Sequence, residues 1–292
     1  MANTVNVTSD ILAQNALAGF NSIVAPLNTF STNYSPAPAE KGATVSVPLY
    51  GTIANADNFA GNYTTNSDQT VNEVSVSLNT HFYKTIHVSD TDAAKGIDSA
   101  KLAFQAGVAV GTSVFTGAMA VLNRTRATNG TAAYTLNSAS EFHFTGLGNL
   151  RTSAAAWPEK NAILDSTAYT ALLLSFPNGT TLQDKATSNG TVPSAFGFGL
   201  YETNVTPMCQ GNVSGVVMAC NPAALAIASR YLAPDDGGAY KEARPIVDDK
   251  TKATLGYREF YDTAAGKKYC TFEWLGGYSA GVTGAVAWIN ES

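Results

Sequence analysis

The feature that most constrains this fold is a long apolar stretch without charge in the middle of the chain. The 21 residues 102–122 contain no charged side chain, and apolar residues recur along them at helical spacing. With its flanks, the pattern predicts a helix over about residues 98–126, roughly 43 Å long at 1.5 Å per residue. Gly107, Gly111 and Gly117 lie within it, and each costs roughly 1 kcal/mol relative to alanine. Packing against other elements must therefore hold this helix, and we expect it to act as a scaffold.

A stretch of this length also meets the criterion for a membrane span, and Gly107 and Gly111 form a G-x-x-x-G pair. However, polar residues such as Gln105 interrupt it, basic residues flank both ends, and an aromatic belt is missing. We therefore expect no membrane partner, and membrane insertion remains the less favoured alternative.

Charged residues are scarce in this chain. They make up 13% of it, against roughly 25% in an average soluble protein, and Thr, Ser, Asn and Gly take their place. Such a surface lacks the charge repulsion that keeps monomers apart, which favours assembly over a freely diffusing enzyme. The net charge is −5 and no Lys/Arg cluster occurs, so binding of nucleic acid through phosphate neutralisation is not indicated.

Cysteine usage and the N-terminal residues indicate the compartment. The three cysteines, Cys209, Cys220 and Cys270, are widely spaced and form no C-x-x-C pair, so neither a disulfide framework nor a zinc site is predicted. We expect buried thiols in a reducing environment. The first residues lack the basic and apolar regions of a secretory signal, which predicts a chain made in the cytosol.

The first 90 residues are predicted to form an arm and a hairpin. Residues 1–40 contain a short helix capped by Ser9 or Asp10, followed by an extended proline-containing segment with little core of its own. From Gly42 apolar residues recur at every second position, and the same alternation returns after residue 70. Such alternation predicts two strands. The tip between these two strands, residues 51–70, is too polar to bury both faces within its own domain, so we expect it to rest on a neighbouring molecule.

The remaining residues alternate between strand and helix patterns. A buried strand is predicted at 162–164, and a helix follows from Ser166. Residues 141–149 are predicted to be loop with some strand character, and 150–157 a short helix. Asn221-Pro222 predicts the start of another helix running to about residue 230. The other expected elements are strands at 196–201 and 213–219, a hairpin of 256–261 with 268–274, and a last strand within 282–288.

Two patterns could carry chemistry. Gly277-Tyr278-Ser279-Ala280-Gly281 fits the G-x-S-x-G nucleophile elbow, but the hydrolase order needs an acid and then a histidine after the serine, and only Glu291 and no histidine follows it. His81 and His87 share a strand face, yet no third metal ligand lies near them in the sequence. We therefore predict no catalytic, cofactor-binding or metal-binding residues, and a serine hydrolase using Ser279 is a distant alternative.

The order of these elements resembles the major capsid protein of tailed double-stranded DNA bacteriophages. The resemblance lies in the layout of nearly the whole chain and in four short stretches: Lys41-Gly42-Ala43-Thr44-Val45-Ser46-Val47-Pro48, Ala162-Ile163-Leu164-Asp165-Ser166-Thr167-Ala168-Tyr169, Gly199-Leu200-Tyr201-Glu202-Thr203-Asn204-Val205-Thr206-Pro207 and Ala219-Cys220-Asn221-Pro222-Ala223-Ala224-Leu225. The resemblance implies an α+β fold with an N-terminal arm, a long E-loop hairpin, a peripheral domain carrying a long spine helix, and an axial α/β domain. The expected boundaries are 1–41 for the arm, 42–90 for the E-loop, 91–160 for the peripheral domain, 161–250 for the axial domain and 251–292 for the return to the sheet.

The resemblance also implies a function and partners. The chain would self-assemble, through hexamers and pentamers, into an icosahedral shell that encloses packaged double-stranded DNA without binding a specific sequence. It would assemble in the host cytoplasm and reside in the virion capsid, with a separate scaffolding protein, a portal and a decoration protein as candidate partners. Six aromatic residues of the arm and hairpin are candidates for contacts between subunits: Phe20, Tyr50, Phe59, Tyr63, Phe82 and Tyr83.

One departure and one alternative qualify this resemblance. Some relatives cross-link their shells through an E-loop lysine. Residues 42–83 contain no lysine, so covalent cross-linking of this kind is not expected. The closest alternative is an encapsulin-like compartment shell, which has the same fold and encloses an enzyme cargo.

Overall fold

The computed structural model describes residues 5–49, 72–89, 98–129, 131–136, 138, 141–175, 194–204, 215–235, 239–282 and 284–291. The chain divides into two compact units, each built from three separate segments. The first unit comprises Met1–Val45, Ser75–Val121 and Ile227–Ser279, and the second comprises Ser46–Val74, Leu122–Ala226 and Ala280–Ser292. Each unit therefore depends on contacts between parts of the chain that are distant in sequence.

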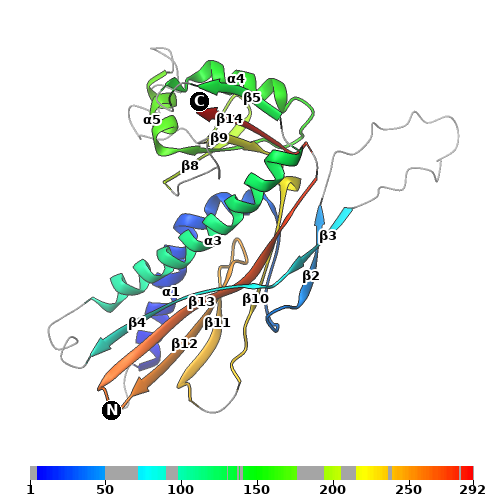
Figure 1. Ribbon diagram of the computed structural model, residues 1–292. Helices are drawn as coiled ribbons and strands as arrows, with labels where there is room; N and C mark the ends of the chain where they lie inside the picture. Colours follow the sequence, from blue (N-terminus) through cyan, green and yellow to red (C-terminus); the bar gives the residue numbers. More distant parts are fainter. Residues whose placement is uncertain are drawn as a thin grey trace, which may run out of the picture. The chain divides into compact units, whose positions relative to one another are not determined.

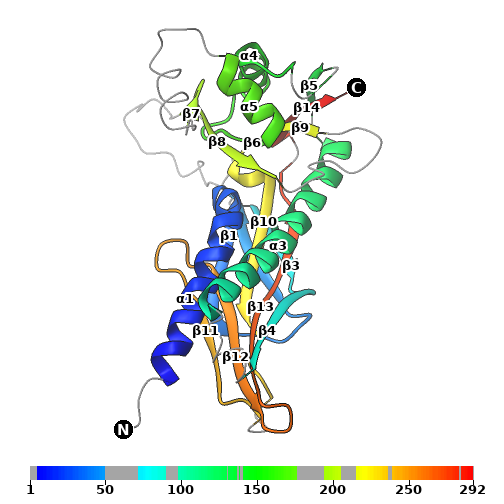
Figure 2. The same ribbon diagram turned by 90° about the vertical axis from the view of Figure 1, so that its left-hand side faces the viewer.

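The first unit is built around a sheet with two helices on one face (Figures 1 and 2). The sheet has the strand order β1-β10-β13-β12-β11, and β4 also pairs with β13. The strands are β1 (Ser31–Pro38), β4 (Thr80–Ser89), β10 (Leu225–Tyr231), β11 (Glu242–Val247), β12 (Thr254–Asp262) and β13 (Lys267–Ala280). The helices are α1 (Val5–Val24) and α3 (Ser99–Asn129). The 3-10 turn η1 (Ala25–Thr29) links α1 to β1.

The predicted long helix is confirmed. It spans Ser99–Asn129, and Asp98 caps its start by accepting hydrogen bonds from the backbone N–H groups of Ala100 at 3.1 Å and Lys101 at 3.3 Å. Its apolar stripe is buried, including Ala106, Val110 and Val114. Packing against α1 and the sheet therefore offsets the low helix propensity of its glycines.

The arm has more structure than its sequence predicts. Its helix begins at Val5 rather than near Ser9, and Leu12, Ala16 and Phe20 are buried. The sequence predicts that the segment has little core of its own, and these residues are buried as part of the core of the first unit. The following segment does form an extended strand, β1, as the prolines suggest.

The hairpin of β12 and β13 determines which side chains face the helices. Asp262 pairs with Lys267 at the turn, and Tyr257 pairs with Phe272. Because directly paired residues share a face and neighbours alternate, Tyr257, Glu259 and Cys270 point toward the helices. Arg258 and Glu273 lie on the opposite face. The predicted hairpin is confirmed, and both strands extend beyond the predicted bounds.

The second unit contains a mixed sheet and two helices. The strand order is β5-β14-β9-β6-β8-β7, with α4 (Phe144–Ser153) and α5 (Ser166–Ser175) beside it. The strands are β5 (Thr131–Leu136), β6 (Asn161–Asp165), β7 (Ser194–Ala195), β8 (Phe198–Thr203), β9 (Gly215–Cys220) and β14 (Val286–Glu291). Side chains of β6, β9 and both helices form one apolar core, in which Leu164, Val217 and Leu172 are fully buried.

Two elements of the C-terminal half differ from their predictions. Asn221 does cap a turn, accepting a hydrogen bond from the N–H of Ala223 at 3.0 Å, but the turn is the short 3-10 helix η3 (Pro222–Ala224). The chain then enters β10, whose first five residues are all buried. A short, continuously apolar run has no period that separates strand from helix. Helix α4 begins at Phe144, so the loop and strand expected there are also wrong.

The hairpin arms β2 (Thr44–Leu49) and β3 (Asn72–Ser77) form a separate two-stranded sheet. Val47, Leu49 and Val76 are buried, and Ser46 Oγ donates a hydrogen bond to Glu73 across the strands at 2.7 Å. The predicted period of two is confirmed for these strands. The tip at 51–70 lies outside the described residues.

Candidate functional site

The nucleophile elbow considered for Ser279 is not formed. Ser279 lies near the end of β13, within extended strand, so the sharp strand-to-helix turn of a nucleophile elbow is not formed there. The described residues that follow β13 include strand β14 and no helix.

The two strand histidines are engaged with separate neighbours. His81 Nε2 lies 3.1 Å from Glu273 Oε2, and the His87 ring lies 5.7 Å from the ring of Tyr269. Within the described part of the chain, no group of three or more His, Cys, Asp or Glu residues could hold a metal ion. Cys220 and Cys270 are free thiols and buried, whereas Cys209 lies outside the described residues.

The six candidate contact residues have different surroundings. Phe20 is only 2% exposed within its own chain, so its side chain belongs to the core of the first unit. Phe82 is half-buried and its ring stacks on Trp274 at 6.3 Å, whereas Tyr83 is 66% exposed. Tyr50, Phe59 and Tyr63 lie outside the described residues. Their roles in contacts between subunits remain predictions.

The α1–α3 contact brings two backbones unusually close. A Cβ atom on Gly107 would lie 1.9 Å from the carbonyl oxygen of Ala16, and one on Gly19 would lie 2.2 Å from the carbonyl oxygen of Phe104. Gly111 is less crowded, with the Phe20 oxygen 3.0 Å from such a Cβ. Two of the three glycines singled out in the sequence thus lie at this contact. The third, Gly117, faces Tyr278, which donates a hydrogen bond to the Val114 carbonyl at 2.9 Å.

The helix layer is also poor in charge. Asp10 is the one charged residue of α1, and Lys101 is the one charged residue of α3 up to Val121. Ile11 and Phe104 are exposed on these helices. Residues Ser99–Leu122 are long and apolar enough to cross a membrane, but half of the most apolar window is buried inside the protein. A core helix of a soluble protein has the same properties, so this is weak support for a membrane span.

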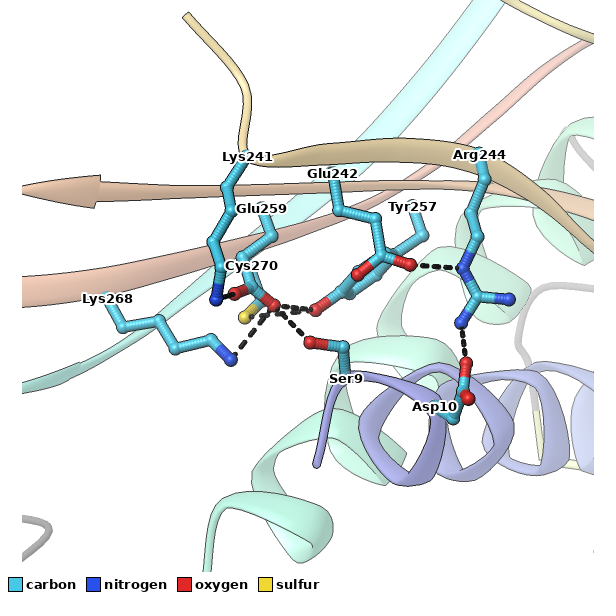
Figure 3. A network of polar contacts seen from close by, with 9 residues as sticks. All are labelled: Ser9, Asp10, Lys241, Glu242, Arg244, Tyr257, Glu259, Lys268 and Cys270. Atoms are coloured by element: carbon cyan, nitrogen blue, oxygen red, sulfur yellow. Dashed lines mark hydrogen bonds and ion pairs between the residues drawn. The ribbon is translucent and has the colours of Figure 1, made fainter. Parts of the chain in front are cut away.

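A buried carboxylate joins α1 to the sheet (Figure 3). Glu259 on β12 is 1% exposed. Its Oε2 accepts hydrogen bonds from Ser9 Oγ and Tyr257 OH, both at 2.6 Å, and lies 2.9 Å from Lys268 Nζ. Its Oε1 lies 3.2 Å from Lys241 Nζ. These residues and Cys270, whose Sγ is 3.6 Å from Tyr257 OH, are called the Glu259 cluster: Ser9, Lys241, Tyr257, Glu259, Lys268 and Cys270.

The surroundings of Glu259 keep it ionised. Burial by itself would raise its pKa, but the hydrogen bonds from Ser9 and Tyr257 and the charge of Lys268 outweigh burial and lower the pKa to about 2. Burial and the hydrogen bond to Glu259 raise the pKa of Tyr257 well above its usual value. The phenol therefore stays protonated and remains a donor to the carboxylate.

Two further polar contacts hold α1 against β11 and the turn that follows it. Arg244 pairs with Asp10 of α1, and its Nε lies 2.6 Å from Glu242 Oε1. Near the other end of the helix, Asn21 Nδ2 donates a hydrogen bond to Asp248 Oδ2 at 3.0 Å. Sequence reasoning considered Ser9 and Asp10 only as helix caps, because their partners lie more than 200 residues away.

A second buried carboxylate lies on the opposite face of the sheet. Glu273 Oε1 accepts a hydrogen bond from Arg258 Nε at 2.7 Å, and Oε2 lies next to His81. Arg258 also donates to the Leu232 carbonyl at 3.1 Å. This group links β4, β12 and β13, whereas the Glu259 cluster joins the sheet to α1, so the two carboxylates stabilise different parts of the unit.

Comparison with solved structures identifies the fold of this chain. No model of a known protein family matches the chain, and no curated protein matches its sequence. Solved structures do match. A virus-like particle from Pyrococcus furiosus has a TM-score of 0.55 and 14% identity, over 96% of this chain and 98% of that one. The capsid of cyanophage P-SCSP1u has a TM-score of 0.53 and 12% identity, over 89% and 86%.

A third match, the capsid of Ralstonia phage GP4, has a TM-score of 0.51 and 10% identity, over 90% of this chain and 86% of that one. Three shells of different origin thus share the path of nearly the entire chain. At such low identities the likeness concerns the fold and not individual residues. The chain has an α+β fold, that of tailed-phage major capsid proteins.

Proposed function

We propose that this protein is the major capsid protein of a tailed bacteriophage, a structural subunit that assembles into an icosahedral shell around double-stranded DNA. The observation that carries the proposal is the extent of the fold match. It includes 89–96% of the chain in matches with TM-scores above 0.5, so no large part remains to form a separate catalytic domain.

The proposal assigns a role to each part of the chain. The first unit, with its long α3 and six-stranded sheet, corresponds to the peripheral domain, and the second unit corresponds to the axial domain. The hairpin of β2 and β3 is the base of the E-loop, and its polar tip would rest on a neighbouring subunit. The low charge content supports this assignment, because subunits of a shell must bury large surfaces against several neighbours.

The proposed content of the shell is DNA. The chain has a net charge of −5, so it would contain DNA that is packaged into it rather than bind that DNA through its phosphates. A portal, a separate scaffolding protein and a decoration protein are proposed partners in this scheme.

A compartment shell that encloses protein cargo is the second candidate. The observation that favours it is the match with a virus-like particle over 96% of this chain and 98% of that one, because this particle is not named as a phage capsid. The two candidates predict the same subunit fold and differ in what the particle contains.

The test is to purify the full chain, expressed alone and with a candidate scaffolding protein from the same source. Light scattering on a sizing column and negative-stain imaging would measure the assembly state. Megadalton shells or capsomers are the expected result, and a stable 30.4 kDa monomer under both conditions would refute the proposal. Nuclease-protected DNA within particles from infected cells would support the virion, whereas a co-purifying enzyme would support the compartment.

A further inference from the structure

Helix α1 is held by its buried apolar face, which includes Leu12 and Phe20, and by polar contacts to the sheet. Its contact with α3 is made by small residues, Gly19 and Ala16 against α3. By contrast, Ser9 donates to Glu259, and Asp10 pairs with Arg244. Hydrogen bonds require specific distances and angles, so these contacts help to determine where α1 lies along the sheet.

Ser9 is the residue of α1 that donates a hydrogen bond to Glu259. The residues one helical turn after it are Leu12 and Ala13, and neither has a side-chain donor. A shift of α1 that brought this turn to Glu259 would leave the carboxylate with one donor fewer in a buried position. Loss of a donor to a buried charged group is costly, so the observed position is favoured.

Glu259 offsets the charge of the two lysines beside it only while it is ionised. From the sheet, Lys241 and Lys268 approach it together with Tyr257 and Cys270. From α1 it meets Ser9, and the charged groups nearby are Asp10, Glu242 and Arg244, which pair among themselves. The side chains of Lys241 and Lys268 are 48% and 26% exposed, so the cluster is open to solvent on the lysine side.

We propose that Glu259 is a proton-sensitive latch for the N-terminal helix: uptake of one proton by its carboxylate loosens the docking of α1 while the sheet of the first unit stays folded. A protonated Glu259 accepts hydrogen bonds from Ser9 and Tyr257 more weakly, and it no longer separates two lysine charges. The sheet keeps the continuous register of β12 with β13 and of β13 with β4. Glu273 and Arg258 on the opposite face are unaffected.

The direction of the pH effect follows from the lowered pKa of Glu259. The ordinary pKa of a glutamate is 4.5, and that of Glu259 in the folded protein is about 2. Ionisation of Glu259 therefore stabilises the docked helix fully above pH 4.5, and this stabilisation is lost as the pH falls toward about 2. Docking of α1 should therefore weaken between pH 4.5 and 2, with the sheet more resistant than the helix.

Hydrogen exchange followed by mass spectrometry on the purified full chain would test the latch, with rates corrected for the chemical effect of pH. Between pH 6 and pH 3, peptides from α1 should exchange about tenfold faster, whereas peptides from β12 and β13 should change less than about threefold. Equal acceleration in α1 and the sheet would mean global unfolding and would overturn the proposal.

Three variants separate the latch from general destabilisation. Glu259→Gln cannot ionise, so its α1 peptides should exchange at least about tenfold faster at pH 6, with little further change at pH 3. Ser9→Ala removes only the donor on α1 and should produce a similar effect without changing the sheet, which keeps the test valid if Glu259→Gln fails to fold. The matched control is Glu273→Gln, which removes the buried carboxylate on the opposite face of the sheet; its α1 peptides should not accelerate more than its β12 and β13 peptides. Unchanged α1 exchange in both Ser9→Ala and Glu259→Gln would refute the latch.

Discussion

Replacing Gly107 by alanine tests the close contact between α1 and α3. The added Cβ would lie 1.9 Å from the carbonyl oxygen of Ala16, 2.8 Å from its carbonyl carbon and 3.0 Å from its Cα. All three atoms belong to the backbone, so no side chain can rotate away. To bring the shortest contact to even 3.0 Å, the two helices must separate by 3.0 minus 1.9, or 1.1 Å.

The expected cost can be derived from two opposing terms. Forcing extra volume into a packed interface costs about 1–3 kcal/mol, and the upper end applies because the obstacle is backbone. Alanine gains about 1 kcal/mol over glycine in helix propensity. The free energy of unfolding should therefore fall by about 2 kcal/mol, which lowers the melting temperature by roughly 4–8 °C for a domain of 150–250 residues.

Thermal unfolding followed by circular dichroism measures this effect, and two matched glycines calibrate it. Gly111→Ala meets the Phe20 oxygen at 3.0 Å and should cost less than Gly107→Ala. Gly148 lies within helix α4 with nothing within 4 Å of its would-be Cβ, so Gly148→Ala should stabilise by about 0.5–1 kcal/mol. If Gly107→Ala raised the melting temperature as Gly148→Ala does, the close helix contact would be wrong.

Three further predictions concern the other parts of the chain. Deletion of residues 51–70 should leave a folded, soluble subunit that forms no regular shells in negative-stain images; normal shells would contradict the role of the hairpin. Leu164→Ala in the core of the second unit, where Leu164 is fully buried, should lower the free energy of unfolding by about 2–5 kcal/mol in urea denaturation, and a loss below 1 kcal/mol would argue against that core. Glu273→Ala should lower the free energy of unfolding by about 3–5 kcal/mol, because it leaves the largely buried Arg258 charge without its carboxylate. Recovery of the wild-type urea midpoint in the double variant Glu273→Ala/Arg258→Met would support this cause. A double variant no more stable than the single one would contradict it.

Local patterns predicted much of the secondary structure. The apolar period of residues 98–126 matches α3, the alternation after Gly42 matches β2, and the turn at 262–267 matches the β12–β13 hairpin. These features depend on spacing between neighbours in the chain, and spacing is visible in the sequence. The glycines of α3 also showed that the helix needed a packing partner, although they did not show which one.

The tertiary structure decided the features that depend on distant partners. Residues 225–231 form the interior strand β10 because β1 and β13 flank them, and a helix was equally consistent with their apolar run. Ser9 faces Glu259 across 250 positions, and no local pattern connects the two residues. The order of elements was sufficient to indicate the capsid fold, because topology follows from the succession of helices and strands. The Glu259 cluster required the folded chain, because a buried charge is stabilised only by donors that folding brings to it from separate segments.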